Sequence, residues 1–133
     1  MNDIEAFKVL NHRWQDLHVE QADGSKLINK LYASVKIRSG YEFRRIYGFI
    51  SWSGTRGELS IIFSDEYIRI EKNGEIIKED KKFHNLTPLE EKRKTINVII
   101  EHDPIVRRFA TLIDKGDELI LQIRKPKDEA DNE

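Results

Sequence analysis

The chain has 133 residues, of which 38% are hydrophobic and 35% charged, and its formal net charge is −1. This length fits one domain with its own core, and no apolar run reaches the roughly 18 residues of a membrane-spanning helix. The absence of cysteine excludes disulfides and thiolate zinc sites, the near-neutral charge excludes a basic field over the whole protein, and an N-terminus without a signal-peptide core predicts a cytoplasmic location.

The first twenty residues have the periodicity of an amphipathic helix. Asn2 followed by Glu5 resembles a capping box, and Asp23-Gly24 ends the segment. The apolar residues that recur at steps of three and four are Ile4, Phe7, Leu10, Trp14 and Leu17. Their single stripe predicts that this helix packs against the rest of the domain or against a partner.

The middle of the chain has the alternation of β-strands. The strands are expected at residues 31–38, 41–52, 59–63, 67–71 and 75–78. Asn73-Gly74 is a signal for a two-residue hairpin, and the other connections are also short. Short connections favour an antiparallel meander of four or five strands over βαβ units.

The last third predicts two consecutive helices and a closing strand. Thr87 is a good N-cap because Pro88 and Glu90 follow it, and that helix should run to about Glu101. Asp103-Pro104 should start a second helix that stops before Gly116. Residues 118–124 should then form a strand that returns to the sheet. The sequence therefore predicts a single α+β domain over residues 1–124, with a disordered charged tail at 125–133.

One face of the second strand carries aromatic and arginine side chains together. Since alternate residues of a strand share a face, Arg45, Tyr47 and Phe49 should lie on the same side. We assign the opposite side, with Ile46 and Ile50, to the core. The expected outer face then collects seven residues, namely Tyr32, Lys36, Arg38, Tyr41, Arg45, Tyr47 and Phe49. Rings interleaved with cations suit single-stranded nucleic acid or a nucleotide, because bases stack on rings and cations bind phosphates.

The segment RIYGFISW, residues 45–52, resembles the ribonucleoprotein octapeptide of RNA-recognition and cold-shock domains. The resemblance implies that Tyr47 and Phe49 are the stacking rings and that Arg45 contacts phosphate. It also implies a five-stranded OB-type barrel as an alternative form of the meander. The segment departs from the pattern at Ile46, which replaces a glycine, and the spacing to residues 31–35 is too short for the helix of an RNA-recognition domain.

Two other interpretations of this face remain open. A helix could cover it and make Tyr47 and Phe49 ordinary core residues. A protein partner could cover it instead, since tyrosine, tryptophan and arginine are enriched at interfaces. We therefore predict a non-enzymatic binding module, with a small protein-binding regulator or inhibitor as the alternative to nucleic-acid binding; the regulator would use this face or the N-terminal helix.

The sequence offers little for catalysis, and we expect no cofactor and no metal. Its histidines are scattered, and the common nucleophile and phosphate-loop motifs are missing. Glu79-Asp80-Lys81 has the E-x-K spacing of metal-dependent nucleases, although a solvated charged loop explains it better. Residues 87–116 could form a helix-turn-helix with Arg107 and Arg108 on its second helix, but two helices packed on a sheet are the simpler interpretation.

Overall fold

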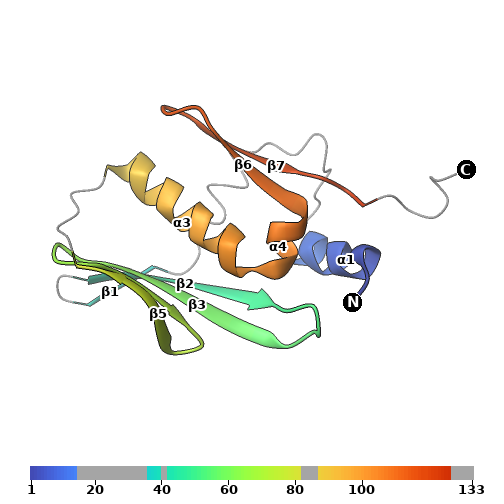
Figure 1. Ribbon diagram of the computed structural model, residues 1–133, viewed down its shortest axis with the longest axis horizontal. Helices are drawn as coiled ribbons and strands as arrows, with labels where there is room; N and C mark the ends of the chain where they lie inside the picture. The colour runs from blue at the N-terminus through green and yellow to red at the C-terminus, as the bar shows by residue number, and fades with distance from the viewer. Residues whose placement is uncertain (15–35, 40–41, 82–86, 127–133) are drawn as a thin grey trace, which may run out of the picture.

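The computed structural model of the protein describes residues 1–14, 36–39, 42–81 and 87–126 (Figure 1). The predicted continuation of the first helix, the first half of the predicted strand at 31–38 and residues 127–133 of the predicted tail lie outside this part. The elements are α1 (Asp3–Trp14), β1 (Lys36–Ser39), β2 (Glu42–Ile50), β3 (Arg56–Phe63), β4 (Ile68–Lys72), β5 (Glu75–Asp80), α3 (Pro88–His102), α4 (Pro104–Phe109), β6 (Ala110–Asp114) and β7 (Leu119–Ile123). This is the predicted α+β architecture.

The main sheet is a five-stranded antiparallel meander in the order β1-β2-β3-β4-β5. Asn73 and Gly74 have φ angles of 52° and 84°, which both central residues of a type I′ hairpin turn require. The hairpin predicted at these residues is therefore confirmed. Among the described residues β1 and β5 form the two edges of the sheet, so it is open and is not an OB-type barrel.

The two consecutive helices begin at the residues that the sequence predicts. Thr87 caps α3, because its Oγ1 accepts a hydrogen bond from the backbone nitrogen of Glu90 at 3.2 Å. Asp103 caps α4 in the same way: its Oδ1 accepts from the backbone nitrogens of Ile105 and Val106, both at 3.1 Å. None of the helices in the described ranges is long and apolar enough to cross a lipid bilayer.

The segment after α4 departs from the prediction. The second helix ends at Phe109 and not shortly before Gly116, because residues 110–114 form β6. β6 pairs antiparallel with β7 as a separate two-stranded sheet, so the C-terminal strand does not return to the main sheet. β-branched Thr111 and Ile113 favour the strand conformation. Arg93 of α3 also binds the turn end of the hairpin, donating to both carboxylate oxygens of Asp114.

The helices cover one face of the main sheet, and the β6–β7 hairpin lies on the other side of α3 (Figure 1). One buried cluster joins all of these layers, and a smaller one lies between α3 and strands β3 and β4. The fully buried larger side chains are Leu10, Leu59, Ile61, Ile62, Ile96, Ile99, Ile105, Leu121, Val106, Thr95 and Asp103. Most of them lie on β3, α3 and α4, so the core is centred between the main sheet and these helices.

Candidate functional site

The aromatic and basic face of β2 is buried beneath the helices. Arg45, Tyr47 and Phe49 are only 3%, 5% and 5% exposed. The register of β2 and β3 sets Tyr47 opposite Leu59 and Arg45 opposite Ile61, and both partners are fully buried. Since opposite residues on paired strands share a face, this face is the core face. The prediction that Arg45, Tyr47 and Phe49 lie on an exposed outer face is therefore wrong.

The other four residues of the predicted surface precede β2. Tyr32 and Tyr41 lie outside the described residues, and so do the side chains of Lys36 and Arg38. The backbone of β1 sets Lys36 opposite Arg45. β1 and β2 are thus neighbours in the sheet, as the sequence predicts.

Arg45 joins the sheet to α3. Its Nε and Nη2 both donate to Glu91 Oε1 at 3.1 Å, and the Glu91 side chain is 21% exposed. A guanidinium group this deeply buried needs a carboxylate nearby to offset its desolvation. Arg45 therefore has a structural partner within the domain, which the local strand pattern could not reveal.

The Phe49 ring lies over a glycine of the next strand. Gly57 is opposite Phe49, and a Cβ atom added to Gly57 would lie 2.2 Å from Phe49 Cζ. The ammonium group of Lys72 lies 5.4 Å from the centroid of the same ring. The ring thus fills the space that a larger residue at position 57 would need, which is a packing role and not an exposed stacking surface.

Tyr47 belongs to a polar network that joins β2, α1 and α4. Its hydroxyl donates to Asp103 Oδ2 at 2.8 Å. Arg13 of α1 has its guanidinium carbon 5.1 Å from the Tyr47 ring centroid, donates to the Gly48 carbonyl, and approaches Asp103 Oδ2 to 3.5 Å. Burial raises the pKa of Tyr47, so its hydroxyl stays protonated and acts as a donor. Burial also raises the pKa of Asp103, against the lowering effect of the hydrogen bonds that the carboxylate accepts.

Both carboxylate oxygens of Asp103 have partners within the fold. Oδ1 accepts from two backbone nitrogens at the start of α4, and Oδ2 accepts from Tyr47 and Arg13. A carboxylate satisfied in this way holds α1 and α4 against the sheet. The network therefore explains the position of the helices.

The structure supports neither the E-x-K nuclease motif nor the DNA-binding helix-turn-helix considered from the sequence. Glu79 of the E-x-K motif pairs with Arg69 at 2.7 Å and lies 3.8 Å from Lys81. The described residues contain no group of three or more histidine, aspartate or glutamate side chains that could hold a metal ion. The second helix of the suggested helix-turn-helix has only 6 residues, and its Arg108 pairs with Asp3 at 2.9 Å.

Exposed apolar surface is instead found on edge strand β5. Ile76 and Ile77 are 56% and 42% exposed, and they are adjacent in the sequence. β5 pairs with β4 alone, so its other edge carries no strand from the described part of the chain. We call this edge, with its exposed residues Glu75, Ile76, Ile77 and Lys78, the β5 edge.

A register shift in the pairing of β4 with β5 explains why two adjacent isoleucines are both exposed. Glu71 of β4 is opposite Ile76 and Ile70 is opposite Lys78, which leaves Ile77 as the extra residue of a bulge. The bulge interrupts the regular alternation of β5, and both isoleucines remain accessible. Sequence reasoning missed this exposed edge. The signal that could have found it is a pair of adjacent isoleucines in the last strand of a meander, because only one face of such a strand can join the core.

No protein-family model matches the chain, and neither the search of curated proteins nor the search of solved structures found a match.

Proposed function

We propose that the protein is a non-enzymatic binding module that captures an extended segment of a partner protein along the β5 edge. The observation that carries the proposal is the exposure of Ile76 and Ile77 on a strand whose outer edge is unpaired among the described residues. Such an edge presents a row of backbone donors and acceptors to which an added strand can bond. Backbone pairing would supply affinity, and the isoleucines would supply selectivity for apolar side chains.

The exposed fractions of the two isoleucines set the size of the hydrophobic contribution. Exposures of 56% and 42% together amount to about one whole isoleucine side chain. Burial of one such side chain contributes about 1.5–3 kcal/mol. Each added backbone hydrogen bond contributes a further 0.5–1.5 kcal/mol or so, and the ordering of the bound segment opposes both terms. The expected affinity is modest, as is usual for short peptides.

The charges on β5 indicate which peptide would fit. Glu75 and Lys78 are exposed on either side of the isoleucine pair, whereas Glu79 is bound to Arg69. The complementary segment therefore carries apolar residues between a basic side chain that faces Glu75 and an acidic side chain that faces Lys78.

Of the simple two-fold antiparallel pairings of β5 with a second copy of the chain, one has complementary charges. Two-fold antiparallel pairing centred on Ile77 would set Glu75 opposite Glu79 of the other copy, and like charges directly opposite are destabilising. Pairing centred on Ile76 would set Glu75 opposite Ile77 and would form no cross-strand ion pair between these residues. Pairing centred between the two isoleucines would set Glu75 opposite Lys78 of the other copy and would form two cross-strand ion pairs. A second copy in this register is the competing occupant, and a concentration-dependent dimer that the two serine substitutions abolish would contradict capture of a different protein.

Binding of single-stranded nucleic acid or a nucleotide to the face of β2 is less favoured. Tyr47 and Phe49 are 5% exposed, so bases could stack on them only if the covering helices moved away. This hypothesis stays a prediction, and titration with a fluorescent oligonucleotide tests it.

Selection from a library of displayed random peptides tests the proposal. We expect enrichment of peptides with adjacent apolar residues between opposite charges. Replacing both isoleucines, as Ile76→Ser with Ile77→Ser, should weaken their binding by at least about tenfold. The matched control is Ile113→Ser, because Ile113 is 37% exposed on β6, outside the main sheet. Selected peptides that bind the double variant as tightly as the original protein would contradict the proposal.

A further inference from the structure

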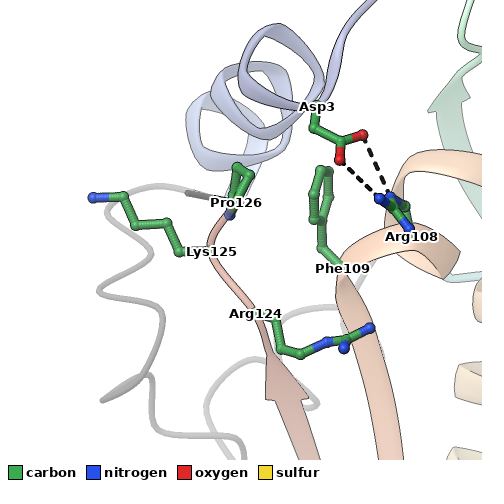
Figure 2. A pocket seen from close by; sticks show the side chains of 6 residues that line it. All are labelled: Asp3, Arg108, Phe109, Arg124, Lys125 and Pro126. Carbon is green, nitrogen blue, oxygen red and sulfur yellow. Dashed lines mark hydrogen bonds and ion pairs between the residues drawn. The ribbon is translucent and has the colours of Figure 1, made fainter. Parts of the chain in front are cut away.

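A small pocket with a basic lining lies where the β7 end meets α1 and α4. It has a volume of about 190 Å³ (Figure 2). The residues that line it are Asp3, Arg108, Phe109, Arg124, Lys125 and Pro126. It lies outside the β5 edge.

Three elements that are distant in the sequence build this pocket. Asp3 is in the first turn of α1, Arg108 and Phe109 end α4, and Arg124 follows β7. A hydrogen bond from the Arg124 backbone nitrogen to the Phe109 carbonyl, at 2.8 Å, holds the β7 end beside α4. Phe109 is 4% exposed and packs edge-on against Phe7, with 5.4 Å between the ring centroids. The pocket is thus assembled on a packed apolar base.

The charges of the pocket do not cancel. Asp3 and Arg108 form an ion pair at 2.9 Å. Arg124 and Lys125 are exposed, and their side chains make no hydrogen bond or ion pair within the described ranges. In Figure 2 the guanidinium groups of Arg108 and Arg124 both end on one side of Phe109, and Lys125 ends on the other. Arg108, Arg124 and Asp3 leave a net positive charge of one on that side of the ring, and Lys125 adds its charge from the other side.

The charge and size together define a class of ligand. Guanidinium groups bind phosphate and carboxylate oxygens through paired hydrogen bonds, and a phosphate monoester carries about 1.5–2 negative charges at neutral pH. A volume of about 190 Å³ is smaller than the roughly 300–1,000 Å³ of sites for drug-sized ligands. The pocket therefore suits one anionic group and not a whole nucleotide.

We propose that this pocket binds the phosphate group of a phosphate monoester. Arg124 supplies the main hydrogen bonds, Arg108 shares its guanidinium group between the ligand and Asp3, and Lys125 adds charge at the rim. The carboxylate of Asp3 competes with the ligand for Arg108. Removal of Asp3 and removal of Arg124 should consequently have opposite effects on binding, which general loss of structure would not produce.

Titration of the isotope-labelled protein with methyl phosphate, followed by NMR, tests the site. Dimethyl phosphate serves as the matched monoanionic probe. We expect methyl phosphate to shift the amide signals of residues 108–109 and 124–125 and to bind more tightly than dimethyl phosphate. Arg124→Gln should weaken binding by about tenfold, since a hydrogen bond to a charged group is lost. Asp3→Asn should tighten binding severalfold, and Lys81→Gln, at an 83% exposed lysine beyond β5, should leave it unchanged.

The phosphate could belong to a small metabolite or to a phosphorylated peptide. Separate titrations with glycerol phosphate and with a short phosphoserine peptide distinguish these sources. The ligand with the lower Kd indicates which source the pocket prefers. The proposal is overturned if neither ester shifts the pocket amides, if mono- and dianionic probes bind equally, or if Asp3→Asn weakens binding as Arg124→Gln does.

Discussion

Replacing Tyr47 by phenylalanine should destabilise the domain although the ring remains. The substitution removes the hydroxyl that donates to Asp103 Oδ2 at 2.8 Å, in a site where Tyr47 is 5% exposed and Asp103 is fully buried. That oxygen would keep only Arg13, at 3.5 Å. Loss of a hydrogen bond to a buried charged group costs about 1.5–3 kcal/mol. We therefore expect the free energy of unfolding to fall by about 2 kcal/mol and Tm to fall by about 5–10 °C.

Urea denaturation followed by tryptophan fluorescence measures this change, with Tyr67→Phe as the matched control. Tyr67 is half-buried, and the guanidinium carbon of Arg69 lies 4.3 Å from the centroid of its ring. Its hydroxyl has no hydrogen-bond partner in the described part of the chain, so Tyr67→Phe should change stability by less than about 0.5 kcal/mol. Equal stability of Tyr47→Phe and the original protein would refute the buried network and restore Tyr47 as a candidate surface residue.

Three further substitutions test the core and its pH dependence. Gly57→Ala should destabilise by about 1–3 kcal/mol in urea denaturation because its Cβ would overlap the ring above it, whereas Gly48→Ala, whose Cβ would meet only one atom at 4.0 Å, should be tolerated. Phe63→Ala should cost about 3–5 kcal/mol, since this side chain is 7% exposed, and an unchanged midpoint would refute its place in the core. Burial lowers the pKa of His102 below 6.5, so the unfolded chain takes up this proton first as the pH falls. Stability should therefore decline below pH 6.5 less steeply in His102→Gln, and equal slopes would contradict this.

Local signals in the sequence identify most elements of the fold. The caps at Thr87 and Asp103 and the turn at Asn73-Gly74 act within a few residues, so their physical causes are visible in the sequence. The end of the second helix is harder to predict from the sequence, because Leu112 and Ile113 fit the apolar stripe of a helix as well as a strand. Only pairing of β6 with β7 decides between them.

The inward and outward faces of β2 could not be assigned from its own alternation. Both faces carry apolar residues, and a choice between them depends on the register with β3, where a shift of one residue exchanges the faces. Tyr47 and Arg45 can be buried because Asp103 and Glu91 provide polar partners from a later part of the chain. Because of these contacts between distant residues, a strand face whose sequence pattern is typical of a binding surface is buried in the core.

Amide hydrogen exchange along β5, with and without a selected peptide, tests the proposed function most directly. In the free protein, the amides of Glu75–Asp80 that do not bond to β4 should exchange fast, because no described strand covers that edge. We expect bound peptide to slow the exchange of these amides and to leave exchange in the rest of the main sheet unchanged. Protection that appears elsewhere while β5 continues to exchange fast would contradict it.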